Sequence, residues 1–170
     1  MLKNTRMLVM LALFVALQIV LTRFLSVEVP AQRVSFSFLP IAVSGIMFGP
    51  IAAGVAALVA DLLGATLVGF VPHPGIALNA FLTGFVSGLL LHKNGHSLVR
   101  IIAVCAINIG IIAVFIQPFW VSQLIGASYW PLVVARLPVL VVMFPIQVVL
   151  IKMTWKYLGR YIERSEATSL

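Results

Sequence analysis

The scarcity of charged residues constrains this chain more than any other feature. Of its 170 residues, 62% are hydrophobic and only 9% are charged, and the mean hydropathy is +1.18. Such a composition cannot cover an apolar core with polar surface, so it predicts an all-α protein embedded in a lipid bilayer. No polar stretch is long enough to form a soluble domain. We therefore expect residues 1–170 to form a single membrane domain.

Six apolar stretches predict six membrane-spanning helices, because each is bounded by a loop or by helix-breaking residues. Gly49-Pro50 divides what would otherwise be one very long run into the second and third stretches. The six stretches cover roughly residues 7–21, 38–48, 51–68, 74–91, 101–120, and 131 to beyond 152. The predicted architecture is a six-helix bundle.

The basic residues predict the orientation of this bundle, because loops rich in Lys and Arg stay in the cytoplasm. With six crossings, only Arg23 and Arg33 fall in the loops opposite the termini. The side of the termini carries Lys3, Arg6, Lys93, Arg100, Lys152, Lys156, Arg160 and Arg164. We therefore expect both termini to be cytoplasmic. Because these residues flank the spans, they also account for the net charge of +7 without a nucleic-acid partner.

Several motifs that would indicate catalysis or autonomous transport are absent from the sequence. It has no glycine-rich phosphate loop, no His-Glu-x-x-His motif and a single cysteine, Cys105. Asp61 is the only acidic residue within a predicted span, so paired carboxylates for acid–base work are absent. No inverted repeat is apparent either. These absences favour a small binding unit without cofactor, metal or enzymatic activity, which depends on partners for energy.

Polar side chains concentrate in the outer half of the predicted bundle, where they indicate a cup open to the outside. Such side chains are costly in hydrocarbon and usually face a cavity, the bundle interior or one another. The candidates for ligand binding in the spans and outer loops are Arg23, His73, Asn79, Gln117, Trp120, Gln123 and Arg136, with Gln147 deeper.

Some of these candidates also have a structural interpretation. Arg136 lies inside the sixth predicted span and either pairs with Asp61 or contacts a ligand. His73 lies between two prolines and is more typical of a loop than of a metal site. Asn79 and Gln117 fit hydrogen bonds between helices as well as ligand contacts. Trp120 fits either an aromatic belt or a flat contact for a planar ligand.

Small residues four positions apart indicate where helices pack closely. Most of these pairs suit packing within the bundle, and they are Gly45/Gly49, Ala53/Ala57, Ala56/Ala60 and Gly84/Gly88. The pair Ala12/Ala16 on the first span differs, because the other spans have glycines for internal packing. We expect Ala12 and Ala16 to face an external partner.

Two stretches of the sequence resemble the substrate-binding S components of energy-coupling factor (ECF) vitamin transporters, and most closely the folate-specific ones. These stretches are Arg33-Val-Ser-Phe-Ser-Phe-Leu-Pro through Gly49-Pro50, with Gly54 and Ala60-Asp61-Leu-Leu-Gly64, and His73-Pro-Gly-Ile-Ala-Leu-Asn-Ala-Phe-Leu-Thr-Gly84. The likeness runs from Arg23 to about Gly88.

The resemblance implies a folate-capturing subunit that works with a transmembrane scaffold subunit and two cytoplasmic ATPases. It also implies that Ala12 and Ala16 meet the scaffold and that the first outer loop, with Arg33 and Phe36, caps the substrate. The flat pterin ring of folate has an edge of donors and acceptors that suits Asn79, Gln117 or Gln147, and its carboxylates suit Arg23 or Arg33. An S component for a queuosine precursor, pantothenate or riboflavin is the alternative.

Overall fold

The computed structural model describes the chain over residues 2–29, 32–92 and 97–167, with side chains at 5, 7–26, 35–92 and 97–157. Two three-residue strands form a short antiparallel hairpin between the first two helices; they are β1 (Val27–Val29) and β2 (Gln32–Val34). The remaining elements are helices, namely α1 (Leu2–Arg23), α2 (Phe38–Leu67), α3 (Pro74–Leu91), α4 (Leu98–Ile107), the π-helix η1 (Asn108–Ile116), α5 (Gln117–Ile125) and α6 (Tyr129–Ala167).

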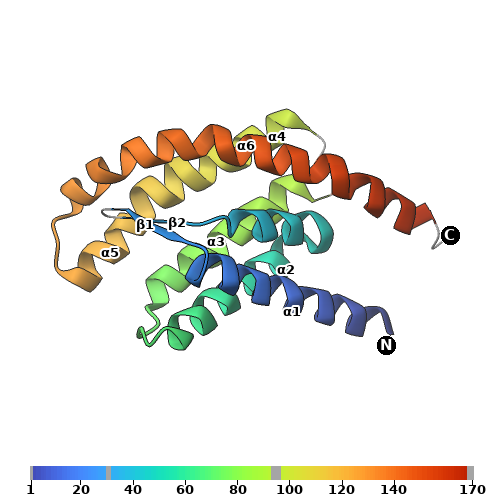
Figure 1. The fold of residues 1–170 in the computed structure, drawn as a ribbon, viewed down its shortest axis with the longest axis horizontal. Coiled ribbons are helices and arrows are strands. Elements are labelled where there is room, and N and C mark those ends of the chain that lie inside the picture. The colour runs from blue at the N-terminus through green and yellow to red at the C-terminus, as the bar shows by residue number, and fades with distance from the viewer. Residues whose placement is uncertain (1, 30–31, 93–96, 168–170) are drawn as a thin grey trace.

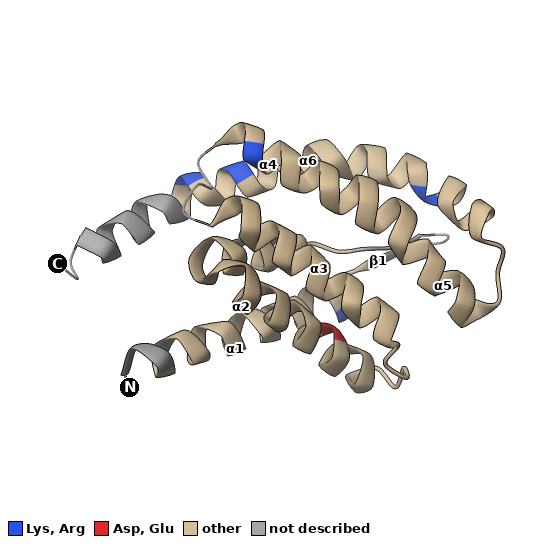
Figure 2. Cartoon of the chain, turned by 180° about the vertical axis from the view of Figure 1, so that it is seen from behind, with Lys and Arg blue, Asp and Glu red and all other residues tan. Residues whose placement is uncertain are grey.

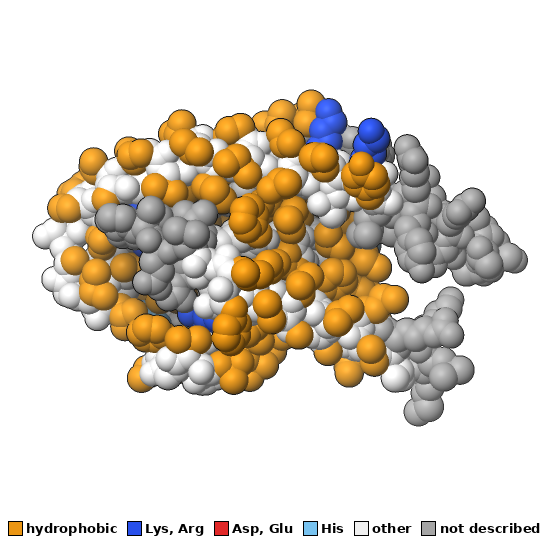
Figure 3. Space-filling view, viewed as in Figure 1, with side chains coloured by type: hydrophobic (Ala, Val, Ile, Leu, Met, Phe, Trp, Pro, Cys, Tyr) orange, Lys and Arg blue, Asp and Glu red, His pale blue; other side chains and the backbone are white. Residues whose placement is uncertain are grey.

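The helices are long and apolar enough to make this a multi-pass membrane protein. Within the described residues, four stretches can each cross a bilayer, and Met7–Arg23 is a shorter apolar helix. The four stretches are Phe38–Leu67, Pro74–Leu91, Leu98–Ile125 and Tyr129–Tyr157. Hydrophobic side chains cover much of the surface in Figure 3, as expected for contact with lipid.

Helix α2 is broken at the predicted position. Gly49 has φ +84° and ψ −176°, a left-handed backbone conformation that favours glycine. Pro50 has no N–H to donate to the Ile46 carbonyl one turn earlier. The ring Nδ1 of His92 lies 3.1 Å from that carbonyl oxygen and donates to it instead. The Ile46 carbonyl therefore keeps a hydrogen-bond partner despite the break.

Helices α2 and α3 make the most intimate contact in the fold, and glycines allow it. A Cβ atom added to Gly45 would lie 2.8 Å from the backbone nitrogen of Gly88. One added to Gly84 would overlap the Ala53 carbonyl, and one added to Gly88 would overlap the backbone of Pro50. The interpretation of these glycines as internal packing residues is confirmed, because backbones this close have no room for side chains.

The start of α1 and the end of α6 lie at one end of the molecule, and α5 and the β-hairpin lie toward the other (Figure 1). An apolar cluster fills the region where α2, α3, α4 and α6 meet, and its buried members are Ala42, Ile46, Leu91, Ile101, Val104, Cys105 and Ile151. Cys105 is thus a packing residue. A cavity with a mixed polar and apolar lining lies elsewhere in the bundle.

The contact between α2 and α3 can be tested with a matched pair of glycine substitutions. Gly84→Ala should lower the free energy of unfolding by about 1 to 3 kcal/mol, since the new methyl group overlaps the Ala53 backbone. Gly110→Ala should leave stability unchanged or raise it by up to about 1 kcal/mol, because a Cβ at Gly110 meets nothing within 4 Å. Thermal unfolding in detergent measures both. Equal effects would contradict the packing described here.

Candidate ligand-binding site

A cavity of about 240 Å³ lies between α1, α2, α3, η1 and α6. Its apolar lining comes from Phe38, Ile41, Ala57, Ala60, Ile76, Ala80, Ile109, Ile112, Ala113, Leu140 and Met143. Its polar lining comes from Gln18, Thr22, Ser35, Ser37, Asp61, Asn79, Thr83, Asn108, Gln117 and Gln147. A cavity that combines apolar walls with converging polar groups is typical of a site for a small organic molecule.

Three amide side chains in this cavity carry buried atoms that make no hydrogen bond to a described residue. They are Nε2 of Gln18, both side-chain amide atoms of Asn79, and Oδ1 of Asn108. Gln18 is only 2% exposed and Asn79 only 5%. Because buried polar groups are almost always hydrogen-bonded in proteins, these atoms indicate a polar ligand with both donors and acceptors.

The orientation of Asn108 follows from a chain of hydrogen bonds along α3. The Thr83 hydroxyl donates to the Asn79 carbonyl at 2.8 Å, and the Ser87 hydroxyl donates to the Thr83 carbonyl at 2.7 Å. Because its proton is used in this way, Ser87 Oγ accepts from Asn108 Nδ2 at 3.1 Å. This leaves Asn108 Oδ1 as an acceptor for a ligand.

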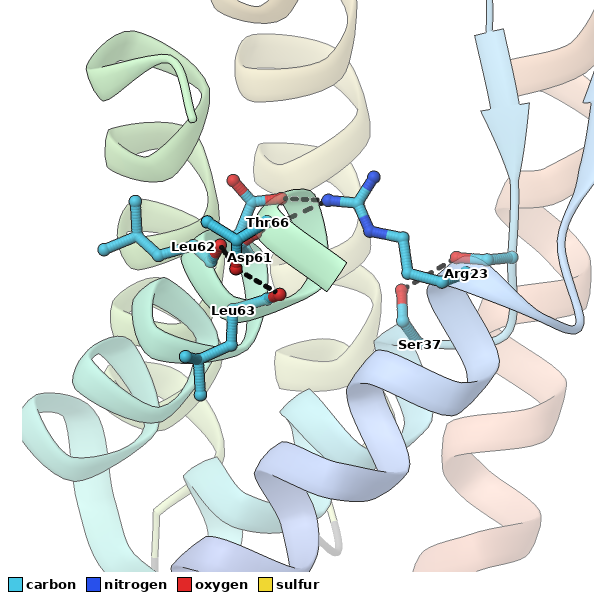
Figure 4. A network of polar contacts seen from close by, with 7 residues as sticks. Arg23, Ser37, Asp61, Leu62, Leu63 and Thr66 are labelled. Carbon is cyan, nitrogen blue, oxygen red and sulfur yellow. Dashed lines mark hydrogen bonds and ion pairs between the residues drawn. The ribbon is translucent and has the colours of Figure 1, made fainter. Parts of the chain in front are cut away.

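Arg23 and Asp61 form an ion pair at the edge of the cavity (Figure 4). Arg23 Nη2 lies 3.4 Å from Asp61 Oδ1 and 3.4 Å from the Asp61 carbonyl oxygen. A Cβ at Gly64 would lie 2.9 Å from Arg23 Nε, so glycine at this position admits the guanidinium. The alternative in which Arg136 pairs with Asp61 is not what the structure shows. Arg136 is 2% exposed and lies outside the cavity lining.

His73 and Trp120 lie at the N-terminal end of α3 and are not part of the cavity lining. The Nδ1 atom of His73 accepts from the Gly75 backbone N–H at 3.2 Å and caps α3. The Trp120 indole lies against Gly75, where any Cβ would overlap the ring, and its centroid is 5.8 Å from that of His73. The indole Nε1 is buried and makes no hydrogen bond to a described residue.

The remaining sequence candidates have varied positions. Asn79, Gln117 and Gln147 come from three different elements and line the cavity together. Phe36 and Gln123 are exposed and lie outside its lining. The side chain of Arg33 lies outside the described residues.

Sequence reasoning did not identify several lining residues as candidates. They are Gln18, Thr22, Ser35, Ser37, Asp61 as a lining group, Thr83 and Asn108. Gln18 and Asn108 carry the same signal as Asn79 and Gln117, since each is a lone amide within an apolar stretch. The hydroxyl residues carry no comparable signal, because Ser and Thr often bond to their own helix, as Thr83 does.

Substitutions at Arg23 and Asp61 test the ion pair. Arg23→Leu should lower the free energy of unfolding by about 1 to 3 kcal/mol, because the Asp61 carboxylate loses its charged partner. Combining it with Asp61→Leu should restore much of this loss. As a control, Arg136→Leu and Asp61→Leu should have additive effects. Thermal unfolding of the single and double variants measures the coupling, and coupling of Asp61 to Arg136 instead would contradict the structure.

Comparisons with known proteins place this fold and cavity in a family. Residues 2–155 match the model of the ECF-type riboflavin transporter S component family. The folate transporter FolT of Clostridium novyi (strain NT) is 32% identical over 159 residues, which cover 93% of this chain and 92% of the relative. The crystal structure of FolT bound with folic acid is similar, with a TM-score of 0.80 and 31% identity over 91% of this chain and 92% of the other. This chain therefore belongs to the S components of ECF-type transporters, which are transport subunits and not enzymes.

Proposed function

We propose that this chain is the folate-binding S component of an ECF-type vitamin importer. The observation that carries the proposal is the set of unsatisfied amide atoms of Gln18, Asn79 and Asn108 in one cavity. Similarity to FolT, and to a FolT structure that contains folic acid, supports folate as the molecule that satisfies them.

The chemistry of folate matches this lining. Its pterin ring is flat and carries adjacent amino, ring N–H and carbonyl groups, so it both donates and accepts. Asn79 offers a donor and an acceptor, Gln18 a donor and Asn108 an acceptor. The apolar side chains between them, such as Ile109 and Ile112, contact the faces of the ring. Arg23 or Arg33, at the outer end of the bundle, binds the glutamate carboxylates.

Riboflavin is the second candidate, because the matching family is described by that vitamin. Its ring system is also flat and has polar ring edges, but its tail carries hydroxyl groups where folate has carboxylates. Arg23, which is paired with the cavity-lining Asp61, therefore favours folate. Competition between the two vitamins for the purified protein separates the candidates.

The position of the chain ends supports a proposal for the orientation of the protein in the membrane. We propose that the break at Gly49 turns α2 into two of six spans and that both termini are cytoplasmic. Figure 1 supports this, since α1 begins and α6 ends at the same end of the molecule. Figure 2 adds basic residues at the start of α4 and on the neighbouring part of α6, near that end. The cavity, in the other half, then receives folate from outside the cell.

Transport requires energy from partners, which we propose are a transmembrane scaffold subunit and two cytoplasmic ATPases. Ala12 and Ala16 are exposed on one face of α1. Small side chains there allow a partner helix to approach closely in the membrane, where close packing drives association.

Folate binding by the purified chain tests the proposed function. The protein should bind folate tightly without nucleotide or partner subunits, and riboflavin should not displace it. Asn79→Ala should weaken binding by roughly tenfold to a hundredfold, because one or two ligand hydrogen bonds are lost. Gln123→Ala removes an exposed amide outside the cavity and should have no effect. Titration calorimetry measures the folate affinity of the wild-type chain and of both variants. Preferential binding of riboflavin, or no binding of either vitamin, would overturn the proposal.

Uptake by cells tests the docking surface. Ala12→Trp or Ala16→Trp should abolish folate uptake but leave folate binding by the purified chain intact, because the bulky ring blocks contact with the scaffold. Met10→Trp serves as the control, since Met10 is exposed, lies about 120° or more around α1 from both alanines, and should retain uptake. Loss of binding together with uptake would indicate instead that the two alanines pack within the bundle.

A further inference from the structure

Asn108 and Gln117 both line the cavity, although their spacing in the sequence argues against it. They lie nine residues apart on the continuous stretch Leu98–Ile125. An α-helix turns by about 100° per residue, so nine residues amount to two full turns and a half. Two such residues would point to opposite sides of an α-helix, and only one of them would face a ligand.

The π-helix η1 removes this conflict. It begins at Asn108 and ends at Ile116, and the Gln117 N–H donates to the Ile112 carbonyl five residues earlier. A π-helix turns by only about 80° per residue, so nine residues complete about two full turns. Asn108, Ile112, Ala113 and Gln117 therefore share the face that lines the cavity.

The spacing of the exposed residues along the same stretch also fits the wide winding. Ile111 is 53% exposed and Phe115 is 54% exposed. Counted from Asn108, these two positions would share its face in an α-helix, at the i+3 and i+7 spacings. Instead, the exposed positions recur at intervals of four and five residues, namely at 102, 106, 111, 115 and 119.

Pro118 supplies a reason for the π-helix. It is the second residue after the end of η1, and its side chain is fully buried. In an α-helix its ring would collide with the carbonyl of Val114, four residues earlier, and it has no N–H to donate there. A wider winding before Pro118 would relieve this collision. Such π-helical segments are rare and frequently occur at functional sites.

We propose that Pro118 and η1 form a positioning element that turns Asn108 and Gln117 toward the same bound folate. The winding thereby gives the site two polar contacts from one helix, where an α-helix would give one. This inference rests on the proposed function only in taking folate as the ligand.

Substitutions at successive positions along η1 and at Gln117 test the positioning element through their effects on folate binding. Gln117→Ala should weaken folate binding by about threefold to tenfold, and Ala113→Leu by at least tenfold, because the larger side chain fills the cavity. Ile111→Ala and Phe115→Ala should leave the affinity within about twofold of wild type, since both side chains point away from the cavity. Sensitivity at Ile111 and Phe115 with none at Ala113 and Gln117 would overturn the inference. Absence of folate binding by the wild-type chain would instead refute the proposed function.

A second test asks whether Pro118 imposes the winding. Pro118→Ala restores a backbone N–H and allows an α-helix, so folate binding should weaken at least threefold. In that background Gln117→Ala should cause no further loss, because Gln117 has turned away from the ligand. A purely structural role of Pro118 would leave the effect of Gln117→Ala unchanged, and that result would overturn this assignment. If Pro118→Ala does not fold, the four substitutions that keep Pro118 decide the positioning role of η1.

Discussion

The close contact between α2 and α3 determines where the rest of the structure can place a ligand. Gly45, Gly84 and Gly88 bring the two backbones together in one half of the bundle. Beyond that contact both helices line the cavity, and their polar lining residues include Asp61 from α2 and Asn79 from α3. The other helices complete the cavity wall around this pair. In a membrane, where lipid is as apolar as the helix surfaces, such shape matching replaces the hydrophobic effect as the main reason for helices to associate.

The sequence predicted the features that depend on local chemistry. Gly49-Pro50 breaks a helix because of its own backbone restrictions, and Gly84 with Gly88 marks a close contact because both lack side chains. Lone amides within apolar stretches, such as Asn79, predicted a cavity, because a polar side chain is costly in hydrocarbon. In the structure Asn79 does line the cavity.

Features that depend on the relative rotation or depth of helices were not predictable in this way. Arg23 pairs with Asp61 across 38 positions in the sequence, and nothing local distinguishes it from Arg136 as the partner. Asn108 and Gln117 lie nine residues apart, or two and a half turns of an α-helix, so an α-helical interpretation of the sequence does not bring them to one face. A single proline can change the helical period, but the sequence alone does not reveal by how much.

The position of Gln18 has a consequence for how binding and assembly are connected. It borders the cavity from α1, and it follows Ala16 by two positions, or about 200° around the helix. Helix α1 thus carries a cavity-lining residue on one side and the exposed small residues on the other. Any shift of α1 that favours the occupied cavity also alters the surface on its outer side. By thermodynamic reciprocity, a neighbour that prefers one position of α1 changes the affinity of the cavity by the same factor.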